Sequence, residues 1–395
     1  MSASAIKYLV KQEQYSPEPW LTSFKYRCMN KFYQSMALIK PKRRADTDYL
    51  VIFKPDAVGD FVLATGAIRC VLQREKRPVV LLTSSETVEI ARSQFPNLIV
   101  HGFPGVIRRK AFSSIAYLTH AWQAAGLYGN CDLLCLRHAL NSNDHIVLRW
   151  LQPARSFGVI NSPIAPQHLT DVPKFTFSTA INYPLERDEF PTEVCAHRDL
   201  LRAFYRERQQ IQSADLAPFL NVKPSTATRR LTIFPSTNMR LRNFPLERLA
   251  HIVNNLDHRL YSDIAVCGSS FDHGPMRSFI SFLARETRAR AIYSSTITEA
   301  LAIIQSSAAV LSMDSAPAHL AIACGTPSVS ILAGGQYGHF APYGKAGVNI
   351  WLSHRTECYG CNWKCPHLEP YCVTNIASSD ILAALKTALR ASMAA

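Results

Sequence analysis

The chain has 395 residues, of which 48% are hydrophobic and 18% are charged, and its formal net charge is +14 at pH 7. This length and hydrophobic content allow two sizeable cores, so we expect two or three globular domains. No apolar run approaches the roughly 20 residues that would span a bilayer, and the N-terminus lacks the apolar stretch of a secretory signal. We therefore expect a cytoplasmic protein.

The positive charge favours an anionic partner, which could be nucleic acid, acidic lipid or a phosphorylated substrate. No zinc-finger, basic-zipper or RNA-binding sheet signature accompanies this charge, so we predict no sequence-directed nucleic-acid binding. Most of the 11 cysteines are scattered, and their odd number is typical of reduced thiols rather than of a disulfide scaffold.

Residues 1–47 form a predicted basic N-terminal extension, in which basic residues alternate with aromatic or aliphatic ones. A helical pattern between Leu21 and Ile39 could lie on the inner face of the cytoplasmic membrane. Basic residues near anionic lipid contribute on the order of 1 kcal/mol each, and four of them follow this pattern: Lys40, Lys42, Arg43 and Arg44. A helix that packs on the neighbouring domain is an equal alternative.

Residues 48–216 alternate apolar strand patterns with helical patterns, which is typical of a doubly wound domain with a parallel sheet. A helix is predicted from about Phe61 to Arg74, and another from Pro191 to Arg208 after a Pro- and Thr-rich segment at Asp171–Leu185. Strands are predicted at Tyr49–Phe53, Val79–Thr83, Leu98–Val100, Asp132–Leu136 and Ser156–Ile160.

Residues 217–395 repeat this alternation, with the crossover between the domains near Ala217–Arg229. Strands are predicted at Arg230–Phe234, Ile264–Cys267 and Ala291–Tyr293, and helices at Pro245–Leu256, Gly274–Thr287 and Thr298–Ser306. A strand, helix and strand unit at Ala309–Leu332 follows. The sequence thus predicts an α/β fold with two Rossmann-like domains that face each other across a cleft.

An acidic residue follows the first predicted strand. Gly59 and Asp60 form a predicted turn there, and in a parallel sheet the carboxyl ends of the strands face the ligand. The Asp60 carboxylate would then project into the cleft as a catalytic group. Plain N-capping of the next helix is an equally good explanation of this carboxylate.

A polar and basic segment follows the first strand of the second domain. Ser236 and Thr237 can donate hydrogen bonds to a phosphate oxygen, while Arg240 and Arg242 add forked, permanently charged donors. The alternative is that these arginines are simply solvated at the mouth of the domain.

The unit at Ala309–Leu332 carries a third polar group. Asp314 and Ser315 lie where a strand ends, and His319 lies on the following helix. The N-terminus of that helix offers unpaired N–H groups and about half a unit of positive charge, which suits a phosphate-bearing ligand. An ordinary crossover with a well-capped helix has the same pattern.

Four segments together resemble glycosyltransferase family 9, the heptosyltransferase family, from Tyr49 onward. They are DAVGDFVLATGAIR at 56–69, PSTNMRLRNFP at 235–245, the segment from Thr298 to Leu332 and APYG at 341–344. The resemblance implies a GT-B fold that closes over a nucleotide-sugar donor, and transfer with inversion at the anomeric carbon.

The resemblance also implies roles for single residues. Asp60 stands at the position of the general base, and Arg242 stands where the family usually has Lys. Asp314, Ser315 and His319 match the donor-binding segment, together with Ser236, Thr237 and Arg240 at the phosphate. Ala316 replaces the usual Gly, which could narrow the space at the donor.

The charge that develops on the departing diphosphate can be met by these cationic and amide donors, so no catalytic metal is required. We expect transfer of heptose from ADP-heptose to a lipopolysaccharide-type glycan or glycolipid. One alternative has a protein acceptor, as in the autotransporter heptosyltransferases. Another is a non-catalytic nucleotide-binding or assembly protein. A dinucleotide oxidoreductase is disfavoured because no GxGxxG turn follows either first strand.

Residues 358–372 contain a cysteine cluster, CYGCNWKCPHLEPYC. This density of thiols suits tetrahedral coordination of zinc or iron, so a structural metal is predicted, with reduced thiols or a disulfide as the alternative. The start of the cluster is similar to that of autotransporter heptosyltransferases, where a comparable cluster holds iron, although the middle gap is longer there. The predicted ligands are Cys358, Cys361, Cys365 and Cys372.

Overall fold

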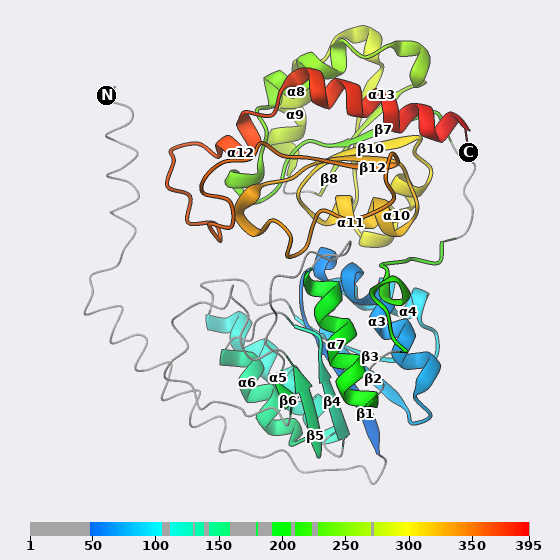
Figure 1. The fold of residues 1–395 in the computed structure, drawn as a ribbon, viewed down its shortest axis with the longest axis vertical. Coiled ribbons are helices and arrows are strands. Elements are labelled where there is room, and N and C mark those ends of the chain that lie inside the picture. Colours follow the sequence, from blue (N-terminus) through cyan, green and yellow to red (C-terminus); the bar gives the residue numbers. More distant parts are fainter. Residues whose placement is uncertain are drawn as a thin grey trace.

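The protein is represented by a computed structural model that describes residues 48–104, 111–128, 131–137, 142–158, 179–180, 192–206, 210–222, 228–269 and 272–394. The described chain forms two α/β lobes, one above the other in Figure 1. The predicted α/β class with two parallel sheets is confirmed. The predicted extension at 1–47 and the segment at 171–185 lie mostly or wholly outside the described residues.

The sheet of the N-terminal lobe has the order β3-β2-β1-β4-β5-β6, with parallel pairing throughout. Alternate residues of β1 face opposite cores: Leu50 and Ile52 pack towards α3, α4 and α7, while Val51 and Phe53 pack towards α5 and α6. The elements are β1 (Tyr49–Lys54), α3 (Val58–Arg74), β2 (Val79–Ser84), α4 (Val88–Gln94), β3 (Ile99–Phe103), α5 (Ala111–Tyr128), β4 (Cys131–Cys135), α6 (Ser142–Leu151), β5 (Arg155–Gly158), β6 (Thr179–Ala180) and α7 (Thr192–Tyr205).

The sheet of the C-terminal lobe has the order β12-β11-β10-β7-β8-β9 and is also parallel. Helices α10 and α11 cover the face towards the other lobe, and α8, α9 and α13 cover the opposite face. The elements are β7 (Leu231–Phe234), α8 (Leu246–Asn254), β8 (Ile264–Gly268), α9 (His273–Ser281), β9 (Ala289–Tyr293), α10 (Ile297–Gln305), β10 (Ala309–Met313), α11 (Ala316–Ala323), β11 (Ser328–Ile331), β12 (Asn349–Leu352), α12 (Tyr371–Thr374) and α13 (Ser378–Ala394).

The predicted start of the first helix is wrong, and this changes the position of Asp60. Helix α3 begins at Val58 rather than at Phe61, because the extended residue Ala57 is its N-cap and the Phe61 N–H bonds to the Ala57 carbonyl over 3.0 Å. Asp60 therefore lies inside the first helical turn and not in a preceding turn. Helix α9 also ends early, at Ser281, before a single 3₁₀ turn and a left-handed Arg288 with φ of 51°.

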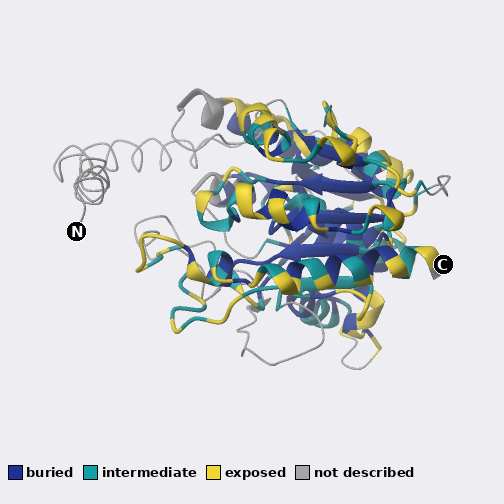
Figure 2. Cartoon of the chain, turned by 90° about the horizontal axis from the view of Figure 1, so that it is seen from above, coloured by how far each residue is buried: buried dark blue, intermediate teal, exposed yellow. Residues whose placement is uncertain are grey.

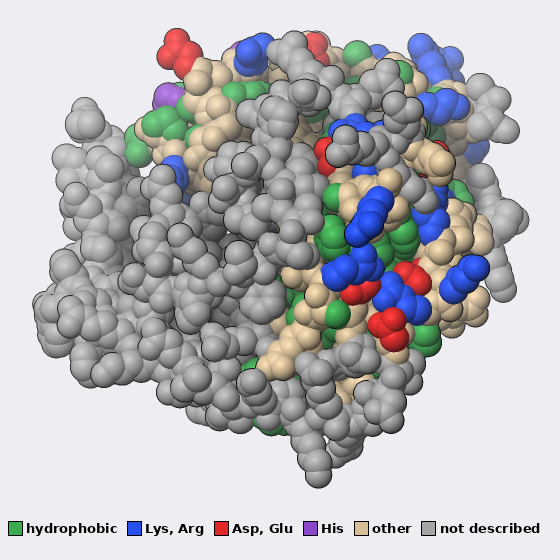
Figure 3. All heavy atoms as spheres, turned by 60° about the horizontal axis from the view of Figure 1, so that its bottom comes forward, with side chains coloured by type: hydrophobic (Ala, Val, Ile, Leu, Met, Phe, Trp, Pro, Cys, Tyr) green, Lys and Arg blue, Asp and Glu red, His purple; other side chains and the backbone are tan. Residues whose placement is uncertain are grey.

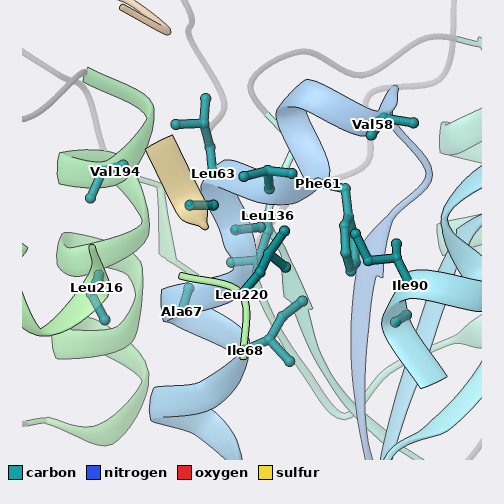
Figure 4. Packing of buried hydrophobic residues seen from close by; sticks show 14 of the residues in the cluster. Val58, Phe61, Leu63, Ala67, Ile68, Ile90, Leu136, Val194, Leu216 and Leu220 are labelled. Atoms are coloured by element: carbon teal, nitrogen blue, oxygen red, sulfur yellow. The ribbon is translucent and has the colours of Figure 1, made fainter. Parts of the chain in front are cut away.

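The two lobes share a hydrophobic core. Helix α3 packs against α11 of the other lobe, and their buried residues belong to one cluster. Figure 4 shows the α3 side of this cluster, with Leu63 and Ala67 near Val194, Leu216 and Leu220. The Leu220 N–H donates to the Ala323 carbonyl over 2.9 Å, so the connection between the lobes is itself bound to α11. Figure 2 shows the strands buried beneath half-exposed helices.

Charged side chains of both signs lie at the amino ends of the N-terminal strands, the end of the molecule that Figure 3 shows. Arg77 pairs with Asp48, Glu75 and Asp132, and Arg155 also pairs with Asp132. These pairs bring two arginines together with three carboxylates at this end. No helix in the described part of the chain is long and apolar enough to cross a membrane.

Candidate active site

Asp60 is not the N-cap of its helix. It is the acidic residue of the first turn of α3, and the N-cap residue Ala57 has no side chain that could cap. A carboxylate here is favoured by the partial positive charge of the helix N-terminus. The alternative explanation by plain N-capping therefore does not hold, and the half-buried Asp60 lies at the carboxyl edge of the sheet, as the sequence predicted.

A buried lysine lies beside this helix start. Lys54, the last residue of β1, is 0% exposed, and its Nζ lies 2.7 Å from Glu193 Oε1, 3.2 Å from Asp56 Oδ2 and 2.8 Å from the Leu136 carbonyl. Burial by itself would lower the pKa of Lys54, but the carboxylates of Asp56, Glu193 and Asp60 outweigh it and raise this pKa above its usual value. The ammonium group is therefore charged, and it acts electrostatically on Asp60.

Glu193 also links the two lobes. The N–H groups of Thr192 and Glu193, at the start of α7, each donate over 3.0 Å to a carbonyl of the other lobe, those of Gly338 and His339. Glu193 Oε2 lies 3.5 Å from His339 Nε2. The buried Lys54 is thus connected through one carboxylate to a loop of the C-terminal lobe.

The starts of α3 and α11 meet across the boundary between the lobes. A Cβ added at Gly59 would lie 2.9 Å from His319 Cδ2 and 3.7 Å from the Cα of Ala316. Only a glycine fits at this distance. Asp60, the next residue along α3, is therefore brought to the same boundary as the predicted donor-binding segment of the other lobe.

His319 is buried and uncharged. Its Nδ1 lies 2.9 Å from the Tyr343 hydroxyl, and its ring stacks on that of Tyr343. Burial, together with the nearby Arg242 cation, lowers the pKa of His319 to about 4. At neutral pH the imidazole therefore offers one N–H donor and one lone pair rather than a positive charge.

Arg242 and Asp314, two of the predicted donor-binding residues, lie side by side. Arg242 Nη1 donates to the Asp314 carbonyl over 3.0 Å, and Arg242 Nε lies 3.9 Å from Asp314 Oδ2. Burial raises the pKa of Asp314 despite Arg242 and a hydrogen bond from the Ala333 backbone. Ser315 is the N-cap of α11, and its hydroxyl donates to the Met313 carbonyl over 3.3 Å rather than capping the helix.

The other predicted phosphate-binding groups have protein partners. The Ser236 hydroxyl donates to Asp272 over 3.3 Å, and the Thr237 hydroxyl donates to the Met239 carbonyl over 3.1 Å. Arg240 Nη2 donates to the Leu368 carbonyl over 3.1 Å, in the cysteine segment. The structure therefore brings Arg242, Asp314, Ser315 and His319 together, and it places Arg240 at the edge of this group.

The four predicted metal ligands lie in one segment that packs on the same end of the sheet. Burial raises the pKa of Cys372, and the neighbouring thiols Cys358, Cys365 and Cys361 raise it further. The four groups are therefore close enough to interact. Among the described residues, however, no three His, Cys, Asp or Glu side chains converge closely enough to hold a metal ion. The donor types suit zinc or iron, while their positions here do not form a coordination site.

Sequence reasoning missed Lys54, Glu193, His339 and Trp363. A lysine that ends an otherwise apolar strand is a usable signal, because a lysine is seldom fully buried without a partner. Glu193 gives no such signal, since it lies 139 residues from Lys54 in sequence. Trp363 gives no such signal either, since its ring reaches Arg242 only because the cysteine segment packs on the end of the sheet.

The family comparison agrees with the motifs. Residues 189–371 match the model of glycosyltransferase family 9 (heptosyltransferase), as the resemblance predicted. Among curated proteins, no sequence matches the chain.

Solved structures show the same fold. A family 9 glycosyl transferase from Veillonella parvula is 14% identical, with a TM-score of 0.63 over 88% of this chain and 98% of that one. The ADP-heptose lipopolysaccharide heptosyltransferase II of E. coli is 14% identical, with a TM-score of 0.59 over 87% and 99%. The iron-containing heptosyltransferase TibC of E. coli, solved with ADP-D-beta-D-heptose, is 12% identical, with a TM-score of 0.50 over 90% and 78%. The predicted GT-B arrangement is thus confirmed.

Proposed function

We propose that the chain, whose residues 189–371 match the model of glycosyltransferase family 9, is an inverting enzyme that transfers heptose from ADP-heptose to a lipopolysaccharide-type glycan acceptor. The observation that carries this proposal is the close approach of Gly59 to His319. This contact supports the proposal because Asp60 follows Gly59 directly, and because His319 belongs to the same lobe as Arg242 and Asp314, the residues that we propose to bind the donor.

In the proposed reaction Asp60 is the general base. It accepts the proton of the acceptor hydroxyl while that oxygen attacks the anomeric carbon, and the bond to the ADP oxygen breaks on the opposite face, so the configuration inverts. A positioned base is worth roughly 10² to 10⁴ in rate. Lys54 is a positioning residue here, because its buried charge favours the ionised form of Asp60.

The departing ADP gains negative charge on its diphosphate. Arg242 and the N-terminus of α11 are the groups that we propose to meet this charge, with Arg240, Ser236 and Thr237 at its edge. With these groups in place, the proposed transfer step needs no divalent metal. The neutral His319 would serve as a hydrogen-bonding partner of the donor rather than as a charge.

Iron or zinc on the cysteine segment is a separate proposal with a structural role. It is supported by the donor types of the four thiols and by the similarity in fold to the iron-containing heptosyltransferase TibC, and it requires the thiols to lie closer together than they do in the structure. Metal analysis of anaerobically purified protein tests it: about one equivalent of iron or zinc is expected, and metal-free protein of full stability would contradict it.

The acceptor and the place of action also remain proposals. A cytoplasmic enzyme whose basic extension contacts anionic lipid at the inner membrane face would meet a lipid-linked glycan there. A protein acceptor is the second candidate, and the fold similarity to TibC together with the cysteine segment favours it. With a protein acceptor, the site and the donor are unchanged.

A donor and acceptor screen followed by mass spectrometry tests the proposed function. The purified chain would be incubated with ADP-heptose, UDP-glucose or GDP-mannose and with either heptose-deficient lipopolysaccharide or an autotransporter passenger domain. Of the three donors, we expect only ADP-heptose to give a product, which is the glycan with a mass increase of one heptosyl unit. An increase on the passenger domain alone would transfer the proposal to the protein acceptor. Tight ADP binding without any transfer would indicate the non-catalytic alternative.

A further inference from the structure

The cysteine segment, here residues 358–372, is seated directly on the backbone next to the proposed donor site. Gly334 and Gly335 follow β11, and a Cβ at either position would lie 2.6 Å from an aromatic ring, that of Tyr359 or of Trp363. Two backbone hydrogen bonds fix this contact, from Gly360 to Gly334 over 2.8 Å and from Asn362 to Gly335 over 2.9 Å. The two glycines therefore allow both rings to lie against the end of the sheet.

Trp363 in turn contacts the guanidinium group of the donor site. The Cζ of Arg242 lies 4.2 Å from the centre of the Trp363 ring, within the range of a cation–π interaction. The same guanidinium donates to the Asp314 carbonyl over 3.0 Å. An arginine held by a ring face on one side and a carbonyl on the other keeps little of its rotamer freedom, so its charge is placed before any ligand arrives.

The segment holds the second arginine as well. Arg240 donates to the backbone carbonyl of Leu368 over 3.1 Å. A side-chain amide adds to the attachment, since Gln336 donates to Asn362 Oδ1 over 3.0 Å. Both arginines that carry the proposed diphosphate contacts thus contact residues between the first and the last cysteine of the segment.

We propose that the cysteine segment is a positioning element of the donor site, and that Trp363 sets the affinity for a nucleoside diphosphate by fixing the guanidinium of Arg242. This rests on the proposed function, in which Arg242 meets the diphosphate of the donor. Trp363 itself need not touch the donor. Because Trp363 already orders the Arg242 side chain, that side chain loses less conformational entropy when ADP binds.

Calorimetric titration with ADP tests the proposal on three variants of the full chain. Trp363→Leu removes the ring face, and we expect ADP to bind about 10-fold more weakly. Trp363→Phe keeps a smaller ring face and should restore most of the affinity. Gly335→Ala displaces the intact Trp363 ring and should also weaken binding, which keeps the test available if Trp363→Leu folds poorly. Turnover at saturating donor should change much less than the affinity for ADP, because the bound diphosphate orders the Arg242 side chain before the transfer step.

A double-mutant cycle with Arg242→Gln identifies the route of the effect. If Trp363 acts through Arg242, Trp363→Leu should change ADP affinity much less in the Arg242→Gln background than in the parent. The matched control is Tyr371→Leu in the same segment, whose exposed ring contacts His367 and which should bind ADP as the parent does.

Three results would overturn the proposal. Parental ADP affinity in both Trp363→Leu and Gly335→Ala would do so, and so would an equal loss of affinity in the two backgrounds of the cycle. Both leave the proposed function intact, because the parent still binds ADP. A parent that binds no ADP would instead overturn the proposed function, and this inference with it.

Discussion

At the end of β1 the Lys54 ammonium lies wholly inside the protein between two carboxylates, those of Asp56 and Glu193. Removing one partner of such a buried group leaves uncompensated charge in a medium that solvates it poorly. We predict that Lys54→Met lowers the free energy of unfolding by about 3 to 5 kcal/mol. Urea denaturation measures this change. Lys54→Arg keeps the charge and is the control, and a Lys54→Met variant as stable as Lys54→Arg would refute the role of the charge.

The buried His319 predicts a dependence of stability on pH. Its pKa falls from 6.5 to about 4 on folding, so the unfolded chain binds more protons than the native chain between these values. Stability from this residue is therefore fully present above pH 6.5 and is lost as the pH falls towards 4, by about 3 kcal/mol in all.

Comparison with His319→Gln isolates this contribution, because the raised pKa of Asp314 affects both proteins alike and acts in the opposite direction. Arg242 and Tyr343, the groups that face the imidazole, also remain in both. We expect the difference in unfolding free energy between the two proteins to shrink as the pH falls from 6.5 to 4. A difference that stays constant over this range would contradict a buried, neutral histidine.

How far the site could be predicted differs from residue to residue. Asp314 directly follows a strand, Arg242 lies in the loop after another strand, and His319 lies in the first turn of a helix. Their short motifs therefore fix where they lie relative to the sheet. Lys54 and Glu193 could not be paired from the sequence, because the fold alone brings together two groups 139 residues apart. The partners of Ser236 and Thr237 were equally hidden: the Ser236 hydroxyl donates to Asp272, 36 residues further along the chain, and the Thr237 hydroxyl donates to the Met239 carbonyl in its own loop.

The candidate site depends on the contact between the starts of helices α3 and α11. Gly59→Ala places a methyl group 2.9 Å from His319 Cδ2, so either the His319 ring or the two helix starts must shift. We predict that kcat/KM falls by about 10-fold or more, because small displacements of catalytic groups are costly. Steady-state kinetics measure this change. Gly274→Ala is the matched control, since nothing lies within 4 Å of its added Cβ. Equal activities of the two variants would rule out the contact as a determinant of the site.

Elements with a strong apolar pattern were predicted well and their ends less so. Strands β1, β2 and β8 agree with the predicted ranges within one residue. The start of α3 was misplaced because Ala57 begins the helix without any capping side chain that a sequence could reveal. The sequence prediction ended at Leu332 and so missed β12 and α13, although Ile381, Leu385 and Leu389 of α13 are fully buried.

In the whole molecule the two lobes are joined by a shared core and by the start of α7, and the predicted pair of Rossmann-like domains is confirmed. The domain boundary near residue 217 stays a prediction. Donor phosphates would bind mainly the C-terminal lobe. A nucleotide that binds only the native state at 100 times its Kd adds about 2.7 kcal/mol to the free energy of unfolding.

We therefore predict that saturating ADP raises the midpoint of thermal unfolding by about 2 to 4 °C, and that a chelator such as EDTA leaves this shift unchanged. Scanning calorimetry measures both. Arg242→Gln, which removes a proposed phosphate contact, should reduce the shift. An ADP shift that vanishes with EDTA would show that a divalent metal mediates binding.

The most direct measurement compares heptose transfer by the parent and by Asp60→Asn, with ADP release followed at saturating ADP-heptose and acceptor. The amide keeps the shape of Asp60 and cannot accept the proton. We expect the same ADP affinity and the same unfolding midpoint in both proteins, with transfer slower by about 10² to 10⁴ in the variant. Transfer by Asp60→Asn at the parental rate would contradict a base from the N-terminal lobe acting on a donor held by the C-terminal lobe.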